Sequence, residues 1–407
     1  MEPAPDLEPA PETQPAPGAG PLSGTTVIEM PGIGPGPFAG MMLADLGATV
    51  IRVDRLSGGK QGLLGVLSAG RADVVSRGRR SIAVDLKSAE GVELVLKLVD
   101  TAEVLIEGYR PGVMERLGLG PDVCLERNPR LVFGRMTGWG QDGPLAHSAG
   151  HDINYIALSG ALGAIGRRGE TPVPPLNLVG DYGGGGMLLA CGVVAALLSV
   201  ARTGAGQVVD AAMVDGAALL MAQFYGMTAL GRWTGERGTN LLDTGAPFYD
   251  VYPSVDGGYL SVGPLEPAFF AILLERLGIL DIDPGSQYDV RSWPALRLRL
   301  AAEFASRTRA AVEELFADVD GCVFPVLSMS EAPQHPHNVA RGTFVTRDDV
   351  VQPAPAPRFS TTPTKLALPP PAAGEHTDAI LAGLGMSADA VRRLHEAGVV
   401  GSAELSG

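Results

Sequence analysis

Residues 25–54 read TTVIEMPGIGPGPFAGMMLADLGATVIRVD, and they decide the fold. The apolar stretch 25–30 predicts a strand, residues 38–46 predict a helix, and residues 49–54 predict the next strand. A strand, a helix and a second strand at this spacing are typical of a parallel sheet whose crossing helices cover its faces. The stretch therefore predicts the start of an α/β domain.

The same alternation continues along the chain. SIAVDL (81–86), EVLIEGY (103–109) and the start of RLVFGRMTGWG (130–140) predict further strands. Residues 88–102 predict a helix, and 110–120 predict a turn with a short helix. We therefore predict a large α/β domain with an open parallel sheet, spanning 21–212 and completed by about 356–407.

An apolar run at 187–201 is rich in Gly and Ala. Its length of about 15 residues is short of the roughly 20 needed to span a bilayer, so we predict a buried helix and no membrane span. Residues 207–230 also have a helical pattern, and we assign 213–244 to linker helices.

The residue pattern of the chain changes after this linker. PFYDVYPS, the turn at Asp256-Gly257-Gly258 and YLSVG predict a β-hairpin, and EPAFFAILLERLG predicts a helix. We predict a small α+β domain over 245–335 and a return linker over 336–355.

Composition excludes some functions. The formal net charge of −14 argues against nucleic acid as a main partner, although a small anionic ligand still fits where Arg and Lys cluster. The three cysteines lie far apart in sequence, which predicts reduced thiols, a cytoplasmic location and no metal site. Residues 1–20 are rich in Pro, Ala and Glu and do not look like a secretory signal. They predict a disordered tail whose deletion leaves activity intact.

One motif outlines a dinucleotide site. Gly34-Pro35-Gly36-Pro37-Phe38-Ala39 fits G-x-G-x-x-G/A, and Asp54 follows 20 residues after Gly34. Pro35 and Pro37 remove N–H donors from the loop that should hold a pyrophosphate, and arginines flank Asp54. A nicotinamide-dependent oxidoreductase is therefore the least favoured of the alternatives, and a plain strand–turn–helix corner is preferred.

Five segments together resemble a known family: EGYRPGVMERLGLG, RMTGWGQDGP, AGHDINYIALSG, PPLNLVGDYGGGG and GQVVDAAMVDG. The chain is similar to the family III CoA-transferases, and most similar to their α-methylacyl-CoA racemase branch, from about residue 21 to the end. The resemblance implies a Rossmann-like large domain, a small domain and an interlocked homodimer. It places each active site between the large domain of one subunit and the small domain of the other.

The resemblance also implies a chemistry, racemisation at C2 of 2-methylacyl-CoA thioesters through an enolate. Such a reaction needs a proton-transferring group on each face of the carbon and a stabilised oxyanion. His151 and Asp181 match the family's acid/base pair. An imidazole exchanges a proton near neutral pH, and a backbone N–H at 151–152 is a candidate donor to the thioester oxygen. Each residue could instead only cap or pack a helix start.

Two further acids complete the predicted catalytic set. By resemblance, Glu266 would reach from the partner subunit to hydrogen-bond His151, or it is simply a solvated acid in a first turn. Asp152 either caps its helix or adds to the site. No cofactor is expected beyond the coenzyme A of the substrate.

The coenzyme A part of the substrate should bind to cations and to strand ends of the large domain. By resemblance, the predicted CoA-binding residues are Arg52, Ala83, Asp85, Leu86, Lys87, Tyr109, Arg110, Arg116, Met136, Thr137 and Tyr155. For any single arginine, a solvated surface charge is the alternative.

The nearest rival function is CoA transfer, in which Asp181 would be a covalent nucleophile. A transferase needs no base on the opposite face, so the His in GHDINY favours the racemase. A catalytically silent CoA-binding protein is less favoured because both His151 and Asp181 are present.

Overall fold

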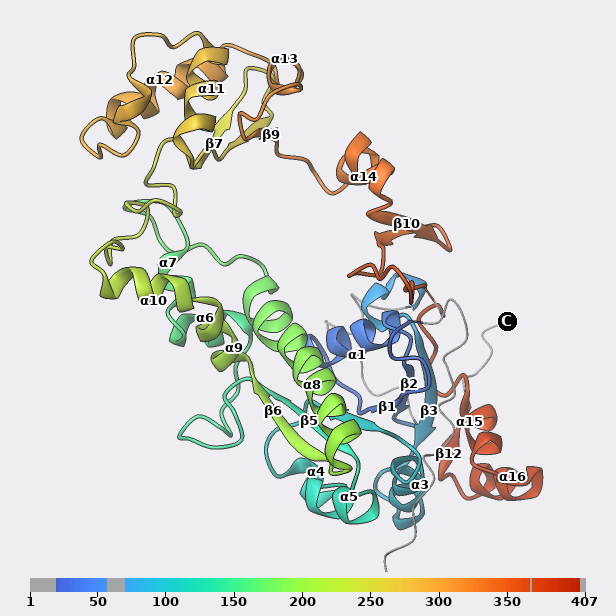
Figure 1. Cartoon of the computed structure of the whole chain (residues 1–407). Helices are drawn as coiled ribbons and strands as arrows, with labels where there is room; N and C mark the ends of the chain where they lie inside the picture. The colour runs from blue at the N-terminus through green and yellow to red at the C-terminus, as the bar shows by residue number, and fades with distance from the viewer. Residues whose placement is uncertain (1–19, 57–69, 367, 403–407) are drawn as a thin grey trace, which may run out of the picture. The chain divides into compact units, whose positions relative to one another are not determined.

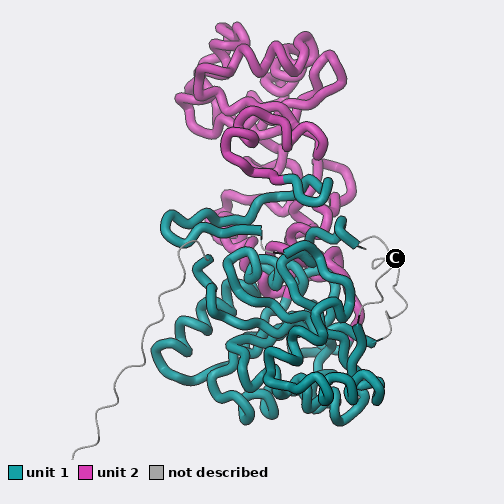
Figure 2. The backbone as a smooth tube through the Cα atoms, turned by 90° about the vertical axis from the view of Figure 1, so that its right-hand side faces the viewer, with its two compact units in different colours: residues 1–147, 185–212, 346–407 teal, residues 148–184, 213–345 magenta. Residues whose placement is uncertain are grey.

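The computed structural model of the chain describes residues 20–56, 70–366 and 368–402. Of the predicted disordered tail, residues 1–19 lie outside this described part. The chain folds into two compact units, shown in Figure 2. The first contains the described residues of 1–147, 185–212 and 346–407, and the second contains 148–184 and 213–345.

A mostly parallel sheet forms the centre of the first unit (Figure 1). In the described part of the chain it has seven strands, in the order β12-β3-β2-β1-β4-β5-β6. Their bounds are β1 Thr26–Glu29, β2 Thr49–Asp54, β3 Arg79–Val84, β4 Val104–Glu107, β5 Val132–Thr137, β6 Gln207–Ala212 and β12 Val400–Gly401. All neighbours are parallel except β12, which is antiparallel to β3. The predicted parallel α/β sheet is confirmed.

Helices and a hairpin complete this unit. Ser88 caps α3 by accepting the N–H of Gly91 at 3.0 Å, so the helix starts where SAEG predicts. The helices are α1 Pro35–Asp45, α3 Ala89–Val99, α4 Val113–Arg116, α5 Pro121–Arg127, α8 Leu188–Thr203, α15 Thr377–Gly383 and α16 Ala388–Glu396, with short 3₁₀ turns at Gly70–Ala72 and Val74–Ser76. The hairpin of β10 Phe344–Arg347 and β11 Val350–Pro353 begins at the end of the second unit and continues into this one, while α14 Pro336–Arg341 belongs to the second unit. All three elements lie in the predicted return linker, which is thus partly structured.

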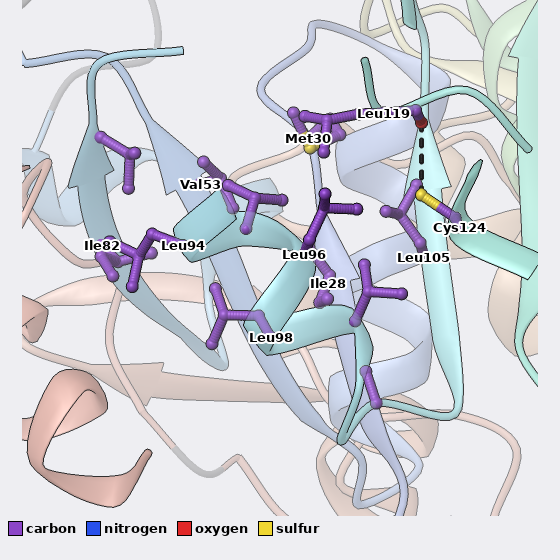
Figure 3. Packing of buried hydrophobic residues seen from close by; sticks show 14 of the residues in the cluster. Ile28, Met30, Val53, Ile82, Leu94, Leu96, Leu98, Leu105, Leu119 and Cys124 are labelled. Atoms are coloured by element: carbon purple, nitrogen blue, oxygen red, sulfur yellow. Dashed lines mark hydrogen bonds between the residues drawn. The ribbon is translucent and has the colours of Figure 1, made fainter. Parts of the chain in front are cut away.

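A hydrophobic core lies between the sheet and α3 (Figure 3). Leu94 and Leu98 of α3 and Ile28, Val53 and Ile82 of the strands are all nearly inaccessible to solvent. Residues four apart on α3 share one face, which explains why SAEGVELVLKLV forms an amphipathic helix over the sheet. This core holds the strand ends in place.

The G-x-G-x-x-A segment forms a strand–turn–helix corner. Gly34 precedes α1 with a φ of 69°, which favours glycine. The Asp54 carboxylate accepts hydrogen bonds from Arg52 Nε at 2.8 Å and from Ser81 Oγ at 2.6 Å. These bonds occupy the acid that would have to contact a ribose in a dinucleotide site.

Two helix predictions are corrected by the structure. Residues 207–212 form β6 beside β5 rather than a helix, because the apolar pattern of this strand merges in sequence with the helix that follows it. The apolar helix is also longer than predicted, because 178–187 continues it as π-helix. Within the described residues, Leu178–Thr203 is the one helix that meets the length and composition of a membrane span, a test that core helices also pass. Its α8 part packs against α1, β5 and β6.

The second unit combines helices with a small antiparallel sheet (Figure 1). Its sheet has the order β7-β8-β9, and the predicted hairpin and the helix after it are confirmed. Residues 148–184, assigned to the large domain from sequence, group here because α6 packs against α9. The elements are α6 Asp152–Leu158, α7 Ala161–Ala164, α9 Met213–Leu220, α10 Ala222–Ala229, β7 Asp250–Pro253, β8 Tyr259–Val262, α11 Pro267–Leu277, α12 Trp293–Ala305, α13 Arg309–Phe316 and β9 Val323–Pro325, with 3₁₀ turns at Pro284–Ser286 and Ala332–Gln334.

Candidate active site

His151 is the residue immediately before α6, and its side chain is exposed. Its backbone N–H donates to Asn154 Oδ1 at 3.0 Å, so a side chain of the first turn fixes the backbone at the histidine. The Tyr155 hydroxyl donates to the carbonyl of Gly150 on the other side of His151. The local sequence GHDINY therefore holds the imidazole at a defined helix start.

Asp181 lies in a π-helical segment, Leu178–Met187, that runs directly into α8. The Tyr182 N–H donates to the Asn177 carbonyl at 3.3 Å, a bond that spans five residues as in a π-helix. The Asn177 side-chain amide donates to Asp181 Oδ2 at 3.1 Å. Asn177 was not predicted from the sequence, although its place four residues before Asp181 in PPLNLVGD could have suggested it.

Asp152 links the two segments. Its Oδ1 accepts the backbone N–H groups of Gly180 and Asp181, each at 2.7 Å. The side chain is buried, and a Cβ on Gly180 would lie only 2.5 Å from Oδ1, so only glycine fits there. The predicted acids Asp152 and Asp181 and the predicted base His151 thus lie together in the second unit.

The pKa of Asp181 is raised above its usual value. Burial is the largest cause and the Asp152 charge adds to it, whereas the Asn177 hydrogen bond and the His151 charge lower the pKa. His151 is therefore close enough to act electrostatically on Asp181. A carboxyl with a raised pKa is better able to return a proton near neutral pH than an ordinary aspartate.

Glycines seat the π-helical segment on its neighbour α9. A Cβ on Gly216 would lie 1.8 Å from the carbonyl oxygen of Gly184, and a Cβ on Gly184 would lie 2.6 Å from the N of Ala217. The two backbones are in direct contact, which no side chain would allow. Close packing thus explains why Gly184 and Gly216 are glycines.

Predicted CoA-binding residues of the first unit lie at the carboxyl edge of its parallel sheet, where ligands of such sheets bind. Arg52, near the end of β2, donates to Asp54, to Ser76 Oγ at 3.2 Å and to the Pro371 carbonyl at 3.3 Å. Tyr109 follows β4, and burial raises its pKa to about 12, partly offset by the charge of Arg55. In the sheet, β1 lies between β2 and β4, and the carboxyl ends of these parallel strands lie at the same edge.

A buried ion pair supports the loop that carries Tyr109. Arg135 Nε donates to Glu107 Oε1 at 3.0 Å, while Glu107 Oε2 accepts the Tyr109 N–H at 2.7 Å. Arg135 also donates to Glu115 Oε1 at 2.8 Å, which ties down α4. Neither Glu107 nor Arg135 was predicted, although two opposite charges at paired positions of adjacent strands were a usable signal.

The other predicted CoA-binding residues of this unit also follow strand ends. Ala83 donates its N–H to Thr377 Oγ1 at 3.2 Å, Asp85 donates its N–H to the Val399 carbonyl, and Leu86 follows Asp85. Met136 and Thr137 end β5, and Thr137 Oγ1 accepts the Gly140 N–H at 2.9 Å. Within the described residues, four cations near these ends are exposed and form no ion pair, namely Arg55, Lys87, Arg110 and Arg116.

Two predicted site residues, Tyr155 and Glu266, lie in the second unit and not at the carboxyl edge of the large sheet. Tyr155 is buried in the second unit, where it holds Gly150. Glu266 precedes α11 and is exposed, and its charge contributes to the raised pKa of Cys322, of which burial is the main cause. Among the described residues, Glu266 forms no hydrogen bond with His151. That part of the chain also contains no cluster of three or more His, Cys, Asp or Glu side chains able to hold a metal.

The sequence profile of CoA-transferase family III matches residues 22–377. The chain belongs to CoA-transferase family III. Among its relatives, alpha-methylacyl-CoA racemase of Mus musculus is 43% identical over 94% of this chain and 98% of that protein. Alpha-methylacyl-CoA racemase of Homo sapiens is 42% identical, again over 94% of this chain and 98% of that protein.

The fold of this family III chain also agrees with a solved structure. The crystal structure of a CAIB/BAIF family protein from Brucella suis aligns with a TM-score of 0.77 at 28% identity, covering 90% of this chain and 100% of that one. The family membership and the α/β architecture expected from the sequence motifs are therefore confirmed.

Proposed function

We propose that the protein racemises C2 of 2-methylacyl-CoA thioesters. The observation that carries this proposal is the joint placement of His151 and Asp181, two proton-transferring groups held in one unit and linked through Asp152. Relatives that share 43% and 42% identity over nearly the whole chain are alpha-methylacyl-CoA racemases, which supports the same chemistry here.

In the proposed mechanism the pair carries one shared proton. In one direction the Asp181 carboxylate takes the C2 proton and protonated His151 returns a proton to the opposite face. In the other direction neutral His151 is the base and protonated Asp181 is the acid. The raised pKa of Asp181 makes its protonated form accessible, which the second direction requires.

The enolate needs a hydrogen-bond donor for its oxygen. The His151 N–H is taken by Asn154, whereas in the described part of the chain the Asp152 N–H has no acceptor. We assign the Asp152 amide at the N-terminus of α6 as the donor to the thioester oxygen. Because the proton removed is replaced, the reaction needs no cofactor beyond the coenzyme A of the substrate.

The carboxyl edge of the large sheet is the proposed CoA site. Phosphates would pair with exposed cations such as Lys87, Arg110 and Arg116, which have no ion-pair partner in the described chain. Arg52 keeps two N–H groups beyond those committed to Asp54, Ser76 and Pro371. A cytoplasmic location remains part of this proposal, consistent with three unpaired cysteines.

We further propose that two copies of the chain form the active dimer. Leu219, Leu220 and Tyr225 of α9 and α10 are more than half exposed, at 62%, 53% and 58%. One face of the small sheet is apolar and uncovered as well, with Tyr259 54% and Phe324 66% exposed. Apolar surface of this extent on one chain favours a covering partner.

A complementation experiment tests the shared site. In the proposed dimer, Glu266 of one copy acts on His151 of the other. A heterodimer of His151→Ala and Glu266→Ala subunits then contains one site with both residues intact and regains activity that neither homodimer has. If the isolated heterodimer stays inactive, the two residues do not act across copies.

The reaction itself is tested with one pure epimer of a 2-methylacyl-CoA in deuterium oxide. We expect deuterium at C2 and loss of optical purity, and we expect His151→Ala and Asp181→Ala each to stop racemisation. The family also makes a CoA-transferase conceivable, with Asp181 as nucleophile. CoA passing to an added carboxylate without exchange at C2 would establish that function instead.

A further inference from the structure

Asp152 occupies an unusual position for an acid at a helix start. The residue is only 7% exposed, yet its carboxylate accepts no hydrogen bond from an N–H of its own helix α6 within the described chain. Both hydrogen bonds of its Oδ1 run instead to the backbone of the segment that carries Asp181, 28 and 29 residues further along the chain. An acid that capped its own helix would accept N–H groups from that helix's first turn.

We propose that Asp152 is a positioning residue for racemisation: its carboxylate joins the helix start that carries His151 to the amides of Gly180 and Asp181, and so sets the geometry of the two proton-transferring groups. The inference rests on the proposed racemase function. His151 and Asp152 are adjacent in the chain, so a shift of the Asp152 backbone relative to the Asp181 segment also shifts the histidine. Two bonds of 2.7 Å to a charged acceptor are strong constraints.

Gly180 lets the backbone of the Asp181 segment approach α6 closely. A Cβ there would lie 2.5 Å from Asp152 Oδ1 and 3.1 Å from Ile156 Cγ2, so the π-helical backbone touches α6 directly. Backbone-to-carboxylate contact leaves little freedom for the distance between the two segments. Mispositioning by about 1 Å can cost about 100-fold in rate, so the link matters for catalysis.

The second oxygen of Asp152 adds an electrostatic role. Oδ2 is buried and has no hydrogen-bond partner within the described chain. A carboxylate oxygen without a donor leaves its charge poorly compensated. The charged groups that act on Asp181 are Asp152 and His151, both from the start of α6, and Asn177 is its polar neighbour. Of these, only Asp152 raises the pKa of Asp181, in addition to burial.

The two roles are separated by two substitutions. Asp152→Asn keeps an Oδ1 that can accept both amides but removes the charge. We expect it to keep kcat within about tenfold, while the acidic limb of kcat/KM moves to lower pH, because the pKa of Asp181 falls. Asp152→Ala leaves two buried N–H groups unpaired, and we expect kcat to fall about 100-fold or more. Asp389→Asn, an exposed first-turn acid of α16, is the matched control and should behave as wild type.

The readouts keep this inference separate from the proposed function. Wild type that fails to racemise any 2-methylacyl-CoA overturns the function itself. Wild-type racemisation with an unshifted acidic limb in Asp152→Asn, or with unchanged kcat in Asp152→Ala, overturns the role of Asp152 alone. A purely structural role would lower the melting temperature of both variants and leave the pH limb of Asp152→Asn where it is in wild type.

Discussion

Replacing Gly216 by alanine tests whether backbone contact seats the Asp181 segment. The new Cβ would lie 1.8 Å from the Gly184 carbonyl oxygen, whereas ordinary contact begins near 3.4 Å. The π-helical segment and α9 must therefore separate by about 1.6 Å at this point. Such overpacking destabilises proteins by about 1–3 kcal/mol. Because Asp181 lies three residues before Gly184, we expect kcat to fall about 100-fold.

The measurement is racemisation of a pure epimer, followed by chiral chromatography, together with the melting temperature. Gly226→Ala in α10 is the matched control, because a Cβ there meets nothing within 4 Å. Filling a helix interior in this way should stabilise the protein by about 0.5–1 kcal/mol and leave kcat unchanged. If Gly216→Ala racemises within twofold of wild type and melts at the same temperature, the contact does not position Asp181.

Three further predictions concern charge and hydrogen bonds. Arg79→Met leaves the buried Glu29 without its partner at 2.9 Å, so urea unfolding should show a loss of about 3–5 kcal/mol in the free energy of unfolding. Arg80→Met is the control, because Arg80 is exposed and forms no ion pair with any described residue, and it should change stability by less than about 0.5 kcal/mol. Asn177→Ala removes a bond that lowers the pKa of Asp181, so the acidic limb of kcat/KM should move to higher pH; a limb that stays or moves down contradicts this assignment. Arg135→Met removes the ion-pair partner of Glu107, whose other oxygen holds the Tyr109 N–H, so KM for acyl-CoA should rise about tenfold with little change in kcat. Arg127→Met is the control: its ion pairs are at the surface, and it should leave KM unchanged.

Much of the fold could be predicted because its signals are local. Strand patterns such as TVIRVD and the amphipathic SAEGVELVLKLV predict a parallel sheet with a covering helix, and both form. Strand β6 was missed because QVVDAA runs without a break into the helical MVDGAALL. Only its pairing beside β5, a contact distant in sequence, distinguishes the two possibilities.

In the candidate site, too, local motifs could be predicted from the sequence and contacts between distant residues could not. His151 and Asp181 could be proposed as a pair because they stand in motifs that resemble those of the family, and the structure places both in one unit. The link through Asp152 could not be predicted, because its partners are 28 and 29 residues away and are backbone amides, which any sequence supplies. The π-helical segment was not predicted either, and its close backbone contact with α9 at Gly184 and Gly216 joins residues more than 30 positions apart in the sequence.

The most direct test of the two-group mechanism is face-selective exchange in the single variants. Each pure epimer of a 2-methylacyl-CoA is incubated in deuterium oxide with His151→Ala or Asp181→Ala, and deuterium at C2 is measured without regard to inversion. We predict that each variant retains exchange with one epimer only, that the two variants retain opposite epimers, and that neither inverts its substrate. Equal exchange of both epimers by either variant would show that one group serves both faces, and would contradict the assignment of His151 and Asp181 to opposite faces of the substrate carbon.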